Sequence, residues 1–158
     1  MGIATYFGLG LTGGAIVIII ISISLPNWVV DNNSHSGLWR NCDDSNGPSI
    51  CQGMSNSPDF LKATQAMELL GLLCLIASLS CVLARVLCAQ EKETLSIFGG
   101  IAGIVAGVFM LLGGIIYGGK FTSLNGDPDD LNMGFALTFL AGALSIVAGI
   151  IFIVGRRH

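Results

Sequence analysis

Two cysteines, Cys42 and Cys51, have the residue type and the spacing for covalent cross-linking within one polar segment of the chain. The stretch between them contains Asn46-Gly47, the strongest two-residue signal for a β-hairpin, because both central positions of such a turn need positive φ. A turn at these residues would place Cys42 opposite Cys51, in a non-hydrogen-bonded pair whose Cα atoms lie about 4.5 Å apart. Because a disulfide accepts that separation, the pattern predicts a Cys42–Cys51 disulfide.

The same two cysteines could instead be free thiols or metal ligands. Free thiols suit a reducing compartment, whereas disulfides form in an oxidising one. A zinc site needs four ligands, and His35 would be the only nearby third ligand. Pro48 has no N–H with which to close the turn from Ser45, so the turn is expected to be open or slightly longer. The disulfide remains the favoured interpretation.

The sequence shows no pattern typical of catalysis. His35 and His158 are the only histidines, and there is no Ser-His-Asp order, Gly-rich phosphate loop or metal-ligand spacing. The net charge of -3 offers no basic face for phosphates, which excludes a nucleic-acid partner. We therefore expect a protein without enzymatic activity and without a cofactor or metal.

The composition indicates a membrane protein that spans the lipid bilayer. Of 158 residues, 53% are hydrophobic and 11% charged, and the mean hydropathy is +0.78. Soluble domains carry roughly a quarter of charged residues. A helix crosses a bilayer with about 20 apolar residues. Windows of that kind predict four spans in one domain, residues 1–158, at 3–25, 63–87, 95–117 and 131–154, with loops at 26–62 and 118–130.

The first span is expected to stay in the mature protein, because it lacks the basic start and the clear cleavage site of a signal peptide. Positive charge favours a cytoplasmic C-terminal tail, through Arg156 and Arg157. The two loop cysteines and a glycosylation sequon at Asn32 indicate an extracellular first loop. We therefore predict a multi-pass protein of the plasma membrane with both termini in the cytoplasm, and glycosylation at Asn32.

Both tryptophans of the chain, Trp28 and Trp39, lie in the first loop. Trp28 follows the end of the first span, where aromatic rings anchor at the level of the lipid headgroups. We predict that both rings seat a small sheet on the helices. The other apolar strand positions would be Val29, Val30, Leu38 and Ile50.

The ordered residues of this loop resemble the signature of the claudin superfamily, in its expected place between the first two spans. They are Trp28, Gly37, Leu38, Trp39, Cys42 and Cys51. Together with the four spans, the resemblance covers essentially the whole chain. It implies an all-α membrane protein, a left-handed four-transmembrane-helix bundle with a small disulfide-stapled extracellular antiparallel β-sheet. It also implies cell–cell adhesion, membrane apposition or membrane-domain organisation.

Within the superfamily, the short first loop, residues 57–67 and the basic end Arg156-Arg157 resemble the branch of peripheral myelin protein, epithelial membrane protein and lens fibre membrane protein. Tight-junction claudins usually have an Arg where Gln65 stands, and they end in a PDZ-binding tail. This chain ends in Arg157-His158. The resemblance implies that the partners are the extracellular loops of like proteins in cis or trans, a homo-oligomer or another membrane protein.

Three side chains in the second span or at its cytoplasmic end are candidates for a specific role. Glu68 is the only acidic residue within a span, which by default makes it a functional candidate. It lies one or two turns from the outer end, within reach of Gln65, so a structural hydrogen bond is favoured over proton or ion handling. Cys88 follows Arg85 at the cytoplasmic end and is a candidate for palmitoylation.

Small residues recur at four-residue spacing in the third and fourth spans, which indicates close approach of helix backbones. They are Gly99, Gly103, Gly107, Ala141, Ser145 and Gly149. Packing within the bundle is the favoured interpretation, and contacts in an oligomer are the alternative.

Two further functions stay open beside adhesion. One is a claudin-like paracellular barrier or cation-selective pore, in which acidic loop residues select cations. Those residues are Asp31, Asp43, Asp44 and Asp59. The other is an auxiliary subunit of a channel or receptor. A transporter is disfavoured, because transporters usually have more spans and interrupted helices.

Overall fold

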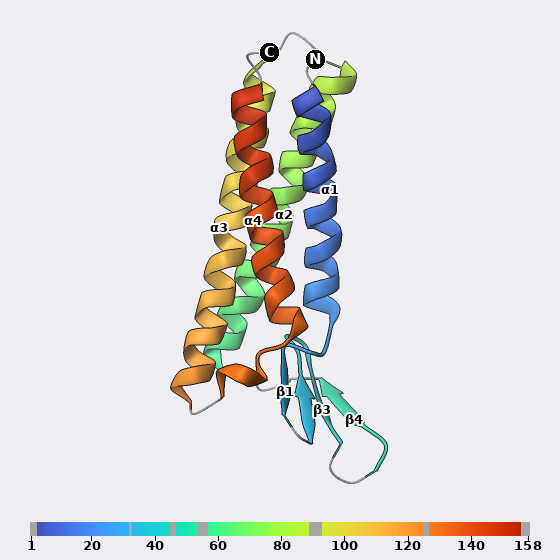
Figure 1. Ribbon diagram of the computed structural model, residues 1–158, viewed down its shortest axis with the longest axis vertical. Coiled ribbons are helices and arrows are strands. Elements are labelled where there is room, and N and C mark those ends of the chain that lie inside the picture. Colours follow the sequence, from blue (N-terminus) through green and yellow to red (C-terminus); the bar gives the residue numbers. More distant parts are fainter. Residues whose placement is uncertain are drawn as a thin grey trace.

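The computed structural model describes residues 3–31, 33–44, 47–53, 57–88, 93–124 and 127–155. Four long helices lie side by side, and a small sheet lies beyond one end of them (Figure 1). The helices are α1 (Ile3–Ser24), α2 (Asp59–Cys88), α3 (Glu93–Ser123) and α4 (Met133–Val154), with a short 3-10 helix η1 (Pro128–Asp130) before α4. The beginning of α1 and the end of α4 lie at the end opposite the sheet (Figure 1).

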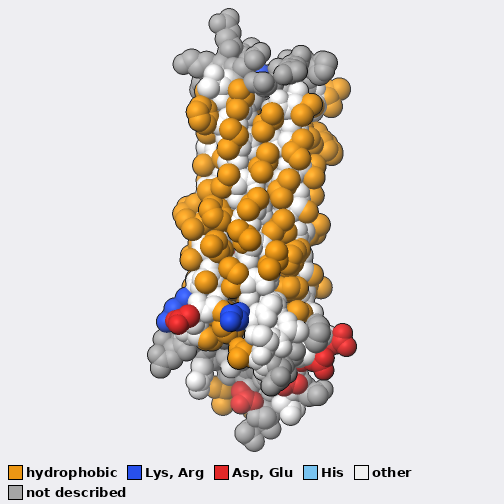
Figure 2. Space-filling model, turned by 90° about the vertical axis from the view of Figure 1, so that its left-hand side faces the viewer, with side chains coloured by type: hydrophobic (Ala, Val, Ile, Leu, Met, Phe, Trp, Pro, Cys, Tyr) orange, Lys and Arg blue, Asp and Glu red, His pale blue; other side chains and the backbone are white. Residues whose placement is uncertain are grey.

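All four helices are long enough and apolar enough to cross a membrane. Large apolar side chains are exposed on their outer faces, among them Leu73 on α2 and Ile115 on α3. Figure 2 shows apolar side chains over the whole helical part of one face, whereas its charged side chains lie mainly at the sheet end. The predicted four-span membrane protein is confirmed.

Two helices extend beyond their predicted spans at the sheet end. α2 begins at Asp59 rather than at residue 63, and α3 ends at Ser123 rather than at residue 117. Helical hydrogen bonding continues where the side chains become polar, whereas hydropathy detects only the part that suits lipid. The extensions carry Leu61, which is buried, and Phe121, and both pack beneath the sheet.

The helices approach one another most closely along α3, which packs against α2 on one side and α4 on the other. A Cβ built on Gly149 would lie 2.6 Å from the carbonyl oxygen of Gly100, and one built on Gly99 would lie 2.6 Å from Val82. The Ser145 hydroxyl donates to the Gly103 carbonyl oxygen at 2.6 Å. These contacts lie inside the bundle.

Gly149→Ala is expected to destabilise the bundle by about 1–3 kcal/mol, because the new methyl group would overlap a backbone atom of the neighbouring helix. Gly10→Ala is the matched control, because a Cβ there meets nothing within 4 Å. In a helix alanine is about 1 kcal/mol better than glycine, so the control should be neutral or stabilising. Thermal unfolding in detergent micelles measures both, and equal midpoints would contradict the close approach.

The sheet has four antiparallel strands in the order β1-β2-β3-β4. They are β1 (Val29–Asp31), β2 (Ser34–Ser36), β3 (Arg40–Asp43) and β4 (Ile50–Gly53). Cys42 faces Cys51, and Asp43 faces Ile50, in the register that the hairpin predicted. Gly47 has the positive φ, 123°, that the turn needs, whereas Asn46 lies outside the described residues. Leu38, predicted on a strand, lies between β2 and β3 instead.

Candidate functional site

Several residues of the first-loop motif lie where the sheet joins the helices, and Trp28 is at the centre of this region. Its side chain is fully buried, and its indole N–H donates to the carbonyl oxygen of Ser22 at 2.8 Å. Its backbone N–H donates to the Ser36 carbonyl oxygen, and its own carbonyl oxygen accepts from the backbone N–H of Asn132. Trp28 thereby connects α1, β2 and the segment that begins α4.

The surroundings of Trp28 correct the prediction that its ring anchors among lipid headgroups. The ring packs edge-on against Tyr117 of α3, with ring centroids 5.0 Å apart, and lies in one cluster with Leu38 and Leu61. A Cβ built on Gly134 would lie 2.5 Å from the indole, so α4 closes the remaining side. Side chains and backbone of the protein therefore enclose the ring, and the predicted packing of Trp28 between sheet and helices is present.

Gly37 and Leu38 fix the sheet to the first two helices. A Cβ on Gly37 would lie 2.5 Å from the Leu25 carbonyl oxygen and 2.6 Å from the Pro26 Cα, so only glycine permits this backbone contact. Leu38 is fully buried, and its carbonyl oxygen accepts a hydrogen bond from the Gln65 side-chain amide at 2.6 Å. We call the region formed by Gly37, Leu38, Gln65 and Trp28 the junction.

The predicted hydrogen bond between Gln65 and Glu68 is wrong. The Gln65 amide points to Leu38 at the edge of the sheet, whereas Glu68 points into the bundle, where its side chain is fully buried. Neither carboxylate oxygen of Glu68 has a hydrogen-bond partner among the described residues. The carboxyl group lies against α3, because a Cβ on Gly113 would come within 2.6 Å of Glu68 Oε1.

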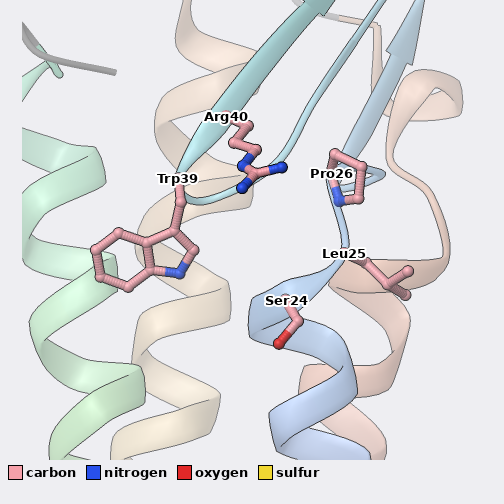
Figure 3. A pocket seen from close by; sticks show the side chains of 5 residues that line it. All are labelled: Ser24, Leu25, Pro26, Trp39 and Arg40. Atoms are coloured by element: carbon pink, nitrogen blue, oxygen red, sulfur yellow. The ribbon is translucent and has the colours of Figure 1, made fainter. Parts of the chain in front are cut away.

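The prediction that both tryptophans seat the sheet on the helices is wrong for Trp39. Its side chain is 43% exposed, and it lies outside the cluster that surrounds Trp28. Together with Ser24, Leu25, Pro26 and Arg40, it lines a groove of about 350 Å³ between the end of α1 and the beginning of β3 (Figure 3). Trp28, Gly37 and Leu38 of the motif therefore lie in the junction, whereas Trp39 lies on the surface.

The Cys42–Cys51 disulfide is confirmed. It joins β3 to β4, with the two Cα atoms 4.0 Å apart, as in a non-hydrogen-bonded pair. Cys42 is buried and Cys51 is exposed, so the bond connects the inner part of the sheet to its outer strand. His35 lies close to both sulfur atoms, but these are bonded to each other and offer no thiolate to a metal. His35 Nδ1 instead lies 3.0 Å from a carboxylate oxygen of Asp44.

The remaining predicted sites lie away from the junction. Cys88 is the last residue of α2, at the end opposite the sheet, and its palmitoylation stays a prediction. Asn32 and the tail Arg156-Arg157-His158 lie outside the described residues. No sequence pattern indicates Ser22, Asn132 or Gly134, because they contact Trp28 through backbone atoms or by lacking a side chain.

The sequence model of the PMP-22/EMP/MP20/Claudin family matches residues 2–152. The chain belongs to this family. The match covers α1, α2, α3, the whole sheet and α4 as far as residue 152. The fold and the family together make the chain a structural, multi-pass membrane protein of the claudin family, with the lipid bilayer as its surroundings. The family description includes claudins beside the myelin and epithelial membrane proteins, so the match assigns no branch.

Proposed function

We propose that this protein joins or organises membranes through the free edge of its sheet, where a second copy of the chain pairs with β4. The two edges of the sheet differ. β1 is bridged to Leu131 through Val29, whereas in the part of the chain that the structure describes β4 has a strand on one side only, and all four of its residues are exposed. An unpaired edge strand is a template for pairing with another chain, and this observation carries the proposal.

The hydrogen-bonding pattern shows which groups the free edge offers. The Arg40 carbonyl oxygen accepts from the backbone N–H of Gly37, on the side of β2. In an antiparallel ladder the backbone N–H and C=O groups of successive residues point alternately to the two sides of a strand. Cys42 and Cys51 form a non-hydrogen-bonded pair, so the backbone groups of each cysteine point away from the other strand. Cys51 and Gly53 therefore direct their N–H and C=O groups to the free edge. The Ile50 side chain, which is 63% exposed, adds apolar surface beside them.

We further propose that the sheet is extracellular and that both termini are cytoplasmic, in the plasma membrane and at contacts between like cells. The disulfide supports this orientation, because such bonds persist on the oxidising side of a membrane. The sheet lies at one end of the bundle, and the beginning of α1 and end of α4 lie at the other (Figure 1).

The branch of peripheral myelin protein, epithelial membrane protein and lens fibre membrane protein remains our proposal for the place of this chain within the family. Gln65 supports it, because the amide at this position holds the Leu38 carbonyl oxygen at 2.6 Å without adding charge to the base of the sheet. An arginine at the same position, as tight-junction claudins usually have, would place a cation there.

Gly53→Pro is expected to abolish most of the cell clustering that the wild-type chain produces in non-adhesive cells. Proline removes the outward N–H of residue 53, while the inward hydrogen bonds to β3 stay intact. Gly53→Ala is the matched control, because it keeps the N–H and its Cβ meets nothing within 4 Å. Clustering is scored at equal surface amounts, and equal clustering by both variants would refute pairing through this edge.

A paracellular cation pore is the second candidate, and the exposed acidic residues of the sheet region favour it. They are Asp31, Asp43, Asp44 and Asp59. A surface of one sign raises the local concentration of counter-ions. Transepithelial resistance and ion selectivity separate the two functions: clustering without a change in resistance supports adhesion, and cation-selective conductance supports the pore. Stoichiometric co-purification with one channel or receptor would instead support an auxiliary subunit.

A further inference from the structure

We propose that the groove lined by Ser24, Leu25, Pro26, Trp39 and Arg40 binds the phosphodiester of a phospholipid from the leaflet on the sheet side. Its volume of about 350 Å³ lies at the lower end of the range for small-molecule sites, roughly 300–1,000 Å³. A cavity of that size suits a headgroup rather than a whole lipid. The groove lies outside the junction, and the sheet-edge proposal does not use it.

Two side chains of the groove, Arg40 and Trp39, carry only hydrogen-bond donors, which suit an anion. Arg40 is exposed, and among the described residues its guanidinium forms no ion pair. Figure 3 shows the guanidinium between the rings of Trp39 and Pro26, and the indole nitrogen of Trp39 on the side of Ser24. The Ser24 hydroxyl already donates to the Ile20 carbonyl oxygen at 2.6 Å. Arg40 and the Trp39 N–H are therefore the groups left to donate to a ligand.

A guanidinium matches a phosphate in both charge and shape, because its parallel N–H groups can donate to two phosphate oxygens at once. An indole beside it suits the boundary between hydrocarbon and water, where tryptophan is enriched. The pair combines one full positive charge with one neutral donor. The sheet region is otherwise rich in exposed acidic residues, so the groove differs in charge from its surroundings.

The position of the groove indicates a lipid rather than a free anion. Ser24 is the last residue of α1, and Ile20 and Val17 lie on the same helix face, one and two turns before it. These two side chains are 45% and 57% exposed. In a bilayer they would contact acyl chains that lead directly to the groove. A phospholipid can thus place its tails along α1 and its phosphate beside Arg40.

The test uses the full chain in a phosphate-free sugar detergent, titrated with phosphatidylcholine. Tryptophan emission reports the groove, because Trp28 is fully buried and Trp39 is exposed. Native mass spectrometry counts retained lipid. We expect a saturable change in emission and one retained lipid for the wild type. Arg40→Gln should weaken binding roughly tenfold or more, the loss typical of one charge-assisted hydrogen-bond pair.

Lys120→Gln is the matched control, because Lys120 is an exposed cation in the last turn of α3, at the sheet end but outside the groove. It should bind like the wild type. Trp39→Phe, followed by mass spectrometry, keeps the aromatic ring and removes the N–H, and it should weaken retention severalfold. It also provides a second route should Arg40→Gln prove unstable in thermal unfolding.

Two further ligands distinguish the sources of the signal. Diacylglycerol has the tails without the phosphate, and inorganic phosphate has the anion without the tails. Neither should shift the emission or displace phosphatidylcholine. The proposal is overturned if diacylglycerol binds as well as phosphatidylcholine, if inorganic phosphate competes, or if Arg40→Gln and Trp39→Phe both bind like Lys120→Gln. Cell clustering through β4 is measured separately, so either proposal can fail alone.

Discussion

Trp28→Ala is expected to lower the free energy of unfolding by about 3–5 kcal/mol, the usual cost of truncating a fully buried tryptophan. The substitution also removes the indole N–H from the Ser22 carbonyl oxygen and leaves a cavity beside Tyr117. Because these contacts connect α1 and α3 to the sheet, the loss should reduce the amount of protein that reaches the cell surface.

Trp39→Ala is the matched control, because it is the same substitution in the same motif at a side chain that is 43% exposed. Exposed substitutions usually change stability by about 0.5 kcal/mol or less. Thermal unfolding in micelles and surface labelling of cells would measure both variants. Equal losses for Trp28 and Trp39 would show that the junction does not depend on the buried ring.

Trp28→Phe separates the hydrogen bond from the packing. Phenylalanine keeps an aromatic ring against Tyr117 but leaves the Ser22 carbonyl oxygen without its side-chain donor. An unsatisfied buried polar group costs about 1–3 kcal/mol, so this variant should fall between the wild type and Trp28→Ala. A Phe variant as unstable as the Ala variant would assign most of the effect to the indole N–H.

The features that the sequence predicted correctly each depend on a local pattern. Long apolar windows predict membrane helices because a bilayer admits few other structures. The hairpin register followed from Asn46-Gly47, because a short turn fixes which residues face each other, and it placed Cys42 opposite Cys51. The family signature then supplied the arrangement of the sheet on the bundle.

The features that the sequence did not predict depend on packing between distant segments. Both tryptophans belong to the same motif, but Tyr117 of α3, Leu61 of α2 and the start of α4 enclose Trp28, whereas Trp39 is exposed. β2 has the sequence Ser-His-Ser, which lacks the apolar residues of a typical strand, and it forms because its two neighbours supply hydrogen bonds. Gln65 lay within reach of Glu68 in the sequence, but its amide faces the sheet.

The disulfide connects β3, in the interior of the sheet, to β4 at its outer edge. β3 lies between two strands and carries the buried Cys42, whereas β4 pairs with β3 alone among the described strands and carries the exposed Cys51. Four residue pairs and one covalent bond therefore fix the edge on which the proposed adhesion depends. Loss of that bond should affect folding and adhesion together.

Cys51→Ser is accordingly expected to reduce surface delivery and cell clustering in parallel. In the chain-entropy model, a disulfide that closes a loop of this length contributes about 2.5–3 kcal/mol. Cys42→Ser should have at least as large an effect, because it also places a hydroxyl group at a buried position. Surface labelling measures delivery, and clustering at matched surface amounts measures adhesion.

Two controls make the result specific to the bond. Cys81→Ser changes a half-buried free thiol of α2 and should leave both measurements near the wild-type values. The double variant Cys42→Ala/Cys51→Ala leaves no unpaired thiol in the sheet, so a defect that it shares with the single variants reflects the lost bond rather than mispairing of the remaining sheet cysteine. Normal delivery and normal clustering in the double variant would show that β4 holds its edge without the disulfide.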